Sequence, residues 1–208
     1  QRNSLTNLMK TNENQNILMI RSFVNELKGK LETLRTLNNN EIRKLNDIAK
    51  KYNIKYQNKH KLDLVDEILS NVDVIPNSIV LAQAAIESGW GKSRFAKEYN
   101  ALFGEYTYDD SEGVIPLERE NGDTHLIKAF SSYSNSVESY FDNINSHYAY
   151  EDFRDIRNIM RKRNNFSNIN LLVNKLSTYA EDENYIKTIR QVIKTNNFGI
   201  FDQKTISY

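Results

Sequence analysis

The chain has 208 residues, of which 39% are hydrophobic and 26% charged, a balance typical of a folded globular protein and not of a disordered one. Its 28 Lys and Arg against 27 Asp and Glu leave a formal net charge of +1, which predicts no broad basic surface for nucleic acid. Cysteine is absent, which excludes disulfides and thiol chemistry, and the three histidines are too widely spaced to predict a metal site, so we expect no cofactor.

The first third of the chain is predicted to be helical. Hydrophobic residues recur every three or four positions from Ile17 to Leu34, which predicts a helix that ends near Leu37. Asn40 is expected to cap a second helix. A third, short helix is expected over Leu62–Val72. These patterns are typical of helix packing, and we expect residues 1–73 to form an N-terminal helical region ahead of a domain at 74–208.

A buried helix is predicted next. Pro76 suits the start of a helix, because its missing N–H would have no partner there. The segment Ser78–Glu87 is apolar on nearly every side, which is typical of a helix that packs inside a domain. Gly89 is expected to end it in the left-handed conformation.

The middle of the chain predicts a β-hairpin. The runs Val114–Arg119 and Thr124–Phe130 flank Asn121-Gly122, a pair that strongly favours a tight turn. If the turn is two residues long, Glu118 faces His125 across the strands.

Helical spacing resumes after the hairpin and continues to the end, in four groups: Val137–Ile144, Phe153–Met160, Leu172–Tyr179 and Tyr185–Ile193. The expected fold is therefore mainly α with one small β element. No stretch approaches the ~20 consecutive apolar residues of a membrane span.

Glu87, at the end of the buried helix, is the residue that points to chemistry. An apolar wall disfavours an ionised carboxylate, so its pKa is expected to rise. A carboxyl group that stays protonated near neutral pH can act as a general acid, as a glycosidase requires. Spacing alone leaves open a structural role, with the carboxylate held by an arginine such as Arg94.

The residues around Glu87 carry a family resemblance. The run from Pro76 through Ala-Ala-Ile-Glu-Ser-Gly-Trp-Gly to Ala96, followed by Asn100-Ala101-Leu102-Phe103-Gly104, resembles the bacterial glucosaminidases of glycoside hydrolase family 73, and within them the Bax-like proteins. The resemblance covers roughly residues 76–198. It implies a lysozyme-like fold, with a helical lobe and a small β lobe, and cleavage of the bond after N-acetylglucosamine in peptidoglycan. It also assigns the general acid to Glu87.

A second group must activate water, attack the sugar or stabilise the transition state. The resemblance often assigns this role to a Glu in the β lobe, where we select Glu118, and it leaves open that the substrate's own acetamido group takes the role instead. Glu120 lies on the same strand face but nearer the turn, where we expect it to be solvated. A surface charge paired with His125 or Lys128 is the other interpretation of Glu118.

Substrate contacts are expected from Gln83, which lies one turn before Glu87, and from aromatic side chains that flank the motif. Tyr179 and Tyr185 match a Tyr-Ala…Tyr pattern of the family, although Glu181-Asp182-Glu183-Asn184 replaces the usual residues between them. The other expected contacts are Phe103 and Tyr106.

Two alternatives remain at this stage. One is a muramidase or lytic transglycosylase on the same scaffold, against which Asn100-Ala101-Leu102-Phe103-Gly104 argues. The other is a wall-binding protein without catalysis. The glucosaminidase interpretation and both alternatives predict the same partner, the glycan strands of peptidoglycan. They also predict a place in the cell envelope, periplasmic or secreted. Because the sequence begins with Gln1 and not Met, we expect that a signal peptide has been removed.

Overall fold

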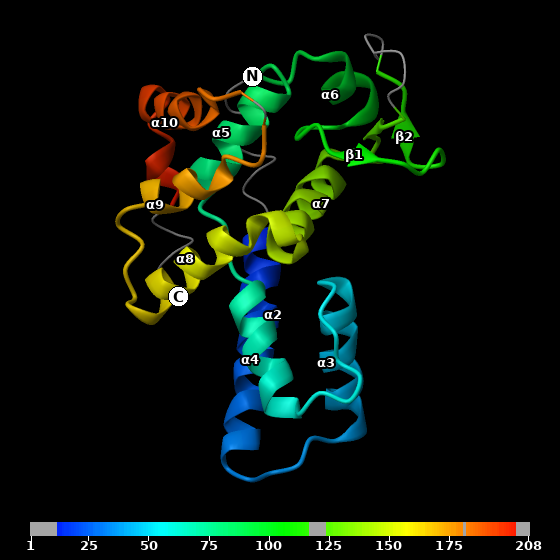
Figure 1. The fold of residues 1–208 in the computed structure, drawn as a ribbon, viewed down its shortest axis with the longest axis vertical. Helices are drawn as coiled ribbons and strands as arrows, with labels where there is room; N and C mark the ends of the chain where they lie inside the picture. Colours follow the sequence, from blue (N-terminus) through cyan, green and yellow to red (C-terminus); the bar gives the residue numbers. More distant parts are fainter. Residues whose placement is uncertain (1–11, 117–123, 181, 203–208) are drawn as a thin grey trace.

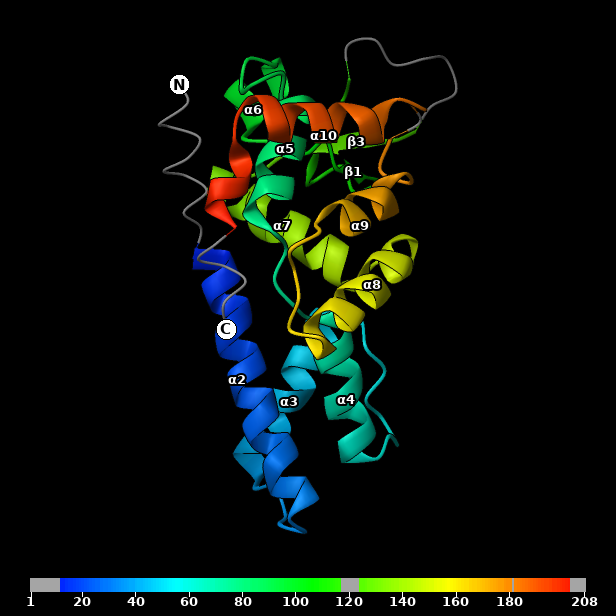
Figure 2. The same cartoon turned by 90° about the vertical axis from the view of Figure 1, so that its left-hand side faces the viewer.

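The computed structural model describes residues 12–116, 124–180 and 182–202, and it shows an arm of helices that extends from a larger lobe (Figure 1). The view turned by 90° shows the same division (Figure 2). The arm consists of α2 Asn12–Glu32, α3 Asn39–Lys51 and α4 Lys61–Asn71. The helices of the lobe are α5 Asn77–Glu87, α6 Arg94–Tyr99, α7 Tyr133–Ser146, η1 Tyr148–Tyr150, α8 Glu151–Lys162, α9 Asn170–Val173, η2 Asn174–Leu176, α10 Tyr185–Thr195 and η3 Phe198–Phe201.

Helix α5 lies inside the lobe, as its apolar sequence predicts, and α10 and η3 pack against it. Its start is fixed by Ser78, whose backbone N–H and hydroxyl both donate to the Asp202 carboxylate, at 2.8 and 2.6 Å. Gly89 follows the helix in the left-handed conformation (φ +55°), where glycine has no Cβ to hinder the turn. Glu87 is therefore the last residue of a rigid, buried helix.

The β element is a three-stranded antiparallel sheet of β1 Tyr106–Thr107, β2 Gly113–Val114 and β3 Leu126–Lys128, in the order β1-β3-β2. The expected pairing of the second and third strands is confirmed, but both are shorter than predicted. Gly113 pairs with Lys128, whereas an unbroken two-residue hairpin at Asn121-Gly122 would have paired it with Phe130. The predicted turn lies outside the described residues. We did not predict β1, because two residues are too few to show an alternating pattern.

The ends of the first two helices also differ from the prediction. Helix α2 ends at Glu32, five residues before Leu37, because Thr33 turns its hydroxyl back onto Gly29 and Lys30 and Leu34 takes a positive φ. Asn38, not Asn40, caps α3. Its side chain accepts from the Glu41 N–H while its own N–H donates to the Glu41 carboxylate, a reciprocal capping box.

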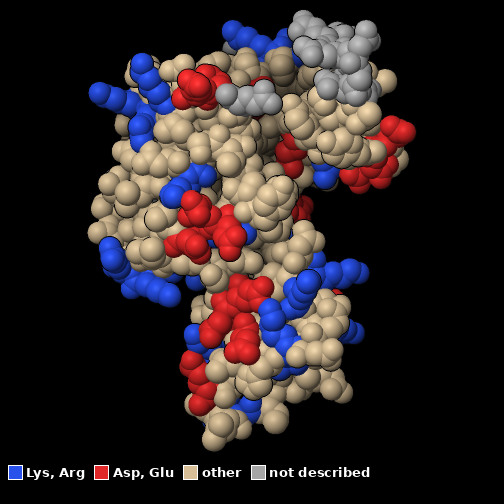
Figure 3. Space-filling model, viewed as in Figure 1, with Lys and Arg blue, Asp and Glu red and all other residues tan. Residues whose placement is uncertain are grey.

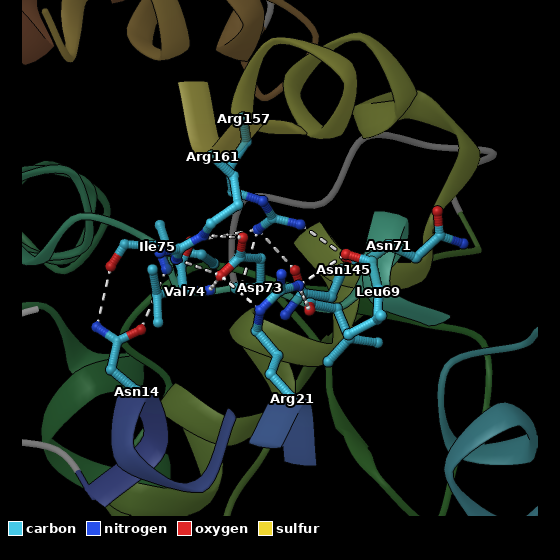
Figure 4. Close-up of polar contacts among 11 residues, drawn as sticks. Asn14, Arg21, Leu69, Asn71, Asp73, Val74, Ile75, Asn145, Arg157 and Arg161 are labelled. Carbon is cyan, nitrogen blue, oxygen red and sulfur yellow. Dashed lines mark hydrogen bonds and ion pairs between the residues drawn. The ribbon is translucent and has the colours of Figure 1, made fainter. Parts of the chain in front are cut away.

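A polar cluster joins the arm to the lobe (Figure 4). Asp73, which follows α4, is fully buried, and its carboxylate accepts two hydrogen bonds from Arg161 of α8, at 2.7 and 2.9 Å. Arg21 of α2 lies 3.4 Å from the same carboxylate. Arg157 of α8, also fully buried, donates to the carbonyl groups of Asn71 and Asp73. The cluster fixes three helices around the segment that leads into α5.

One cluster of buried hydrophobic side chains runs through both arm and lobe, so the boundary between residues 73 and 74 stays a prediction. The mainly helical fold with a small antiparallel sheet and an N-terminal helical extension is confirmed. Within the described ranges, no helix combines the length and apolar character needed to cross a membrane.

Candidate active site

The Glu87 carboxyl group is partly buried at the end of α5 and bonded to a tyrosine. The Tyr185 hydroxyl donates to Glu87 Oε1 over 2.7 Å. Burial raises the pKa of Glu87 above its ordinary value, and the Tyr185 hydrogen bond opposes part of this rise. Arg94 does not hold the carboxylate: its guanidinium donates to the Ile115 carbonyl and stacks on Phe95. Across the described parts of the chain, Glu87 forms no ion pair.

A chain of hydrogen bonds behind Glu87 sets the direction in which Tyr185 donates. The Tyr140 hydroxyl donates to Gln83 Oε1 over 2.6 Å, and Gln83 Nε2 donates to the Tyr185 oxygen over 2.9 Å. Because the Tyr185 oxygen already accepts from Gln83, its own proton is directed to Glu87. Tyr140 and Gln83 are fully buried and Tyr185 nearly so, which keeps the chain of bonds out of water.

Aromatic rings form the wall next to this chain of bonds. The Tyr179 and Tyr185 rings are stacked, with centroids 5.9 Å apart and planes 4° apart. The Tyr179 hydroxyl donates to the Phe103 carbonyl over 3.0 Å, and Phe103 stacks on Tyr140 at 4.2 Å. Segment 103–104 is thereby held against the carboxyl group.

Gly104 leaves space at the second carboxyl oxygen. Its φ of +62° lies in the left-handed region, and a Cβ built there would lie 3.9 Å from Glu87 Oε2. Since Oε1 accepts from Tyr185, Oε2 is the oxygen that faces a position without a side chain.

The structure brings Gln83, Phe103, Tyr179 and Tyr185, four of the expected substrate contacts, together around Glu87. Gln83 and Phe103 are buried and present no side-chain surface to a ligand in this arrangement. Tyr106 lies apart from them, on β1, where it is 64% exposed and its ring packs on His125 at 4.3 Å. Glu118 and Glu120 lie outside the described residues.

Two residues near the site were missed. Tyr140 follows helical spacing on α7, so the sequence assigned it only to the core. Glu105 lies between Gly104 and Tyr106 without any pattern of its own. Its Oε2 accepts from the Ser139 hydroxyl over 2.9 Å, and burial raises the pKa of Glu105 to about 7. Only the tertiary fold produces this burial. No group of three potential metal ligands gathers in the parts of the chain that the structure describes.

Comparison with known proteins gives a consistent result. Residues 62–198 match the family described as Glucosaminidase, mannosyl-glycoprotein endo-beta-N-acetylglucosaminidase. The chain is 35% identical to Protein bax of Escherichia coli (strain K12) over 137 residues, which cover 66% of this chain and 48% of that protein. It is 35% identical to the peptidoglycan hydrolase FlgJ of the same organism over 92 residues, which cover 39% of this chain and 29% of FlgJ.

Among solved structures, the catalytic domain of the autolysin Auto from Listeria monocytogenes aligns with 87% of this chain and 86% of its own, at 19% identity and a TM-score of 0.48. The chain matches about half of the length of Protein bax and less than a third of FlgJ. The family match confirms the resemblance predicted from the residues around Glu87.

Proposed function

The chain belongs to the glucosaminidase family, and we propose that it is a peptidoglycan hydrolase that cleaves the glycosidic bond after N-acetylglucosamine. The observation that carries the proposal is the partly buried Glu87 carboxyl group, with a raised pKa and a directed hydrogen bond from Tyr185. The name of its relative FlgJ, a peptidoglycan hydrolase, supports this substrate. Such a substrate implies a place in the cell envelope.

Glu87 is the general acid of the proposed reaction. Its protonated form donates to the oxygen of the leaving sugar, and the raised pKa keeps that form populated closer to neutral pH. Because Tyr185 donates to Oε1, the acidic proton resides on Oε2, the oxygen beside Gly104. Charge left on Glu87 after proton transfer is stabilised by the same Tyr185 hydrogen bond.

Glu118 is the proposed second carboxylate, which activates water or attacks the anomeric carbon. Gln83 acts by orienting Tyr185, and Phe103 acts by anchoring Tyr179, rather than by touching the glycan. Exposed Tyr106 offers a ring face on which a sugar can stack, and Tyr179 and Tyr185 form the wall beside the acid.

Digestion of purified peptidoglycan, followed by reduction and mass spectrometry, tests this function. We expect new reducing ends on N-acetylglucosamine. New reducing ends on N-acetylmuramic acid would instead identify a muramidase, and anhydromuramyl products a lytic transglycosylase. Binding to walls without any product would identify a protein that only binds.

A further inference from the structure

A hollow lies beside the candidate active site, between the β-sheet, α7, η1 and the end of α3 in the arm. Its volume is about 490 Å³. Figure 3 shows the surface hollowed between the upper lobe and the arm. The side chains that matter for its chemistry come from α3, the β-sheet and the residue before it, α7 and η1: Lys51, Glu105, Tyr106, Lys128, Asp142 and Tyr150. Glu87 is not among the lining residues.

Helix α7 turns a polar stripe toward this hollow. Ser139, Asp142, Asn143 and Ser146 follow helical spacing and all line it, whereas Val137, Tyr140, Phe141 and Ile144 of the same helix are buried in the hydrophobic core. A helix that packs an apolar face needs polar residues only where water or a ligand meets it.

Two carboxylates in the hollow have buried oxygens without a hydrogen-bond partner. Glu105 Oε2 accepts from Ser139, but its Oε1 is buried and accepts no hydrogen bond. Asp142 Oδ1 is also buried without a hydrogen bond, with Lys51 Nζ at 3.4 Å. Burial raises the pKa of Glu105 to about 7 and that of Asp142 to about 6, so nearby cations do not fully compensate either group. Buried acceptors of this kind call for a donor.

The hollow also contains positive charge near its rim. Lys51 pairs with Glu138 at 2.8 Å, and Lys128 lies 3.8 Å from Glu112. About a third of each lysine side chain is exposed. A ligand that carries both an ammonium group and a carboxylate therefore meets both signs in one cavity.

The hollow adjoins the proposed catalytic centre. Tyr150 lines it, and its ring centroid lies 6.2 Å from that of Tyr179, which in turn stacks on the Tyr185 that holds Glu87. Glu105 follows Gly104 directly. Peptidoglycan carries short peptides as branches on alternate sugars, and these contain free carboxylates and the amine of a diamino residue.

We propose that this cavity binds the zwitterionic part of a peptidoglycan stem peptide, with its ammonium group between Glu105 and Asp142 and its carboxylate near Lys51 and Lys128. The inference rests on the proposed function and names a recognition site for the same substrate. Lys51 belongs to α3, so the N-terminal arm completes the site.

Calorimetric titration of the full chain, in a Glu87→Gln background that cannot cleave, tests the inference. The probes are a disaccharide whose stem peptide has a free side-chain amine, the same compound with that amine acetylated, and the disaccharide without peptide. We expect the free amine to bind at least tenfold more tightly than either other probe. Adding Glu105→Gln or Asp142→Asn should abolish the difference, whereas Glu26→Gln, which removes an exposed arm carboxylate, should preserve it.

Circular dichroism and thermal unfolding of each variant separate loss of recognition from loss of fold. Lys51→Met provides a second test. It should lower the affinity for the free-amine probe without changing the affinity for the peptide-free disaccharide. Equal affinity for all three probes, or a preference for free amine that survives both carboxylate variants, would overturn the inference. Amine-dependent binding by a chain that cleaves no wall would instead contradict only the proposed function.

Discussion

The hydroxyl of Tyr185 lies 2.7 Å from Glu87 Oε1, although the two residues are 98 positions apart in the chain. Tyr185 begins α10, which packs along α5, so the docking of these two helices sets the contact. Gln83, one turn before Glu87, donates to the same hydroxyl. Helix α5 thus supplies both the proposed acid, Glu87, and Gln83, which orients the Tyr185 hydroxyl toward it.

Replacing Tyr185 by Phe should change the pH dependence of hydrolysis. The Tyr185 hydrogen bond favours the ionised carboxylate, so its loss raises the pKa of Glu87 further. A general acid works while protonated, so the alkaline limb of the kcat/KM profile should move to higher pH. The rate at the optimum should fall about tenfold as orientation is lost. Tyr179→Phe, which loses only the bond to Phe103, should leave the limb in place. A limb that moves to lower pH in Tyr185→Phe would contradict this assignment.

Replacing Gln83 by Leu should destabilise the fold as well as slow the reaction. The Tyr140 hydroxyl would then be buried without a partner, which costs about 1–3 kcal/mol. Adding Tyr140→Phe removes the unpaired group and should recover much of the loss. Urea unfolding of the two single variants and the double variant measures this coupling. Strictly additive losses would show that the two groups do not depend on each other.

Asp73→Asn should be strongly destabilising. It removes the carboxylate to which Arg161 and Arg21 are paired and leaves cationic groups in a buried cluster, a change that costs about 3–5 kcal/mol. The matched control is Asp152→Asn, which breaks the exposed pair with Lys175 and should leave the unfolding midpoint nearly unchanged. Similar midpoints for both variants would mean that the cluster does not hold the arm.

The same aspartate should make the protein sensitive to acid. Burial alone would raise the pKa of Asp73, but the surrounding arginines lower it below its unfolded value. Its contribution is therefore complete above the unfolded pKa and is lost as the pH falls toward the folded one. Unfolding free energies measured from pH 5 to pH 2 should fall less steeply in Asp73→Asn than in the native chain.

Glu118, the proposed second carboxylate, and Glu120 lie on the same predicted strand, and mutation of each distinguishes their roles. Glu118→Gln should lower the hydrolysis rate at least about 100-fold, in the range expected for a catalytic carboxyl group, and Glu120→Gln should lower it little. Initial rates on a wall suspension decide between them. Loss of activity in Glu120→Gln alone would transfer the role to Glu120.

Local patterns predicted the helices well, because the spacing of apolar residues along consecutive positions indicates both the helix and its buried face. The apolar segment Ser78–Glu87 and the left-handed Gly89 after it are examples. The register of β2 and β3 was not predictable in the same way, since it depends on the length of the connection and not only on its turn signal. Tyr140 and Glu105 acquire their significance from partners on other elements, Gln83 and Ser139, that no spacing rule connects.

The most direct test of Glu87 as the acid is the rate at which the Glu87→Gln variant clears a suspension of purified cell walls, relative to the native chain at the same pH. Glutamine keeps the size of the side chain and can still accept from Tyr185, but it has no proton to give. We predict a loss of at least about 100-fold with an unchanged circular dichroism spectrum. Clearing at the native rate would contradict the assignment.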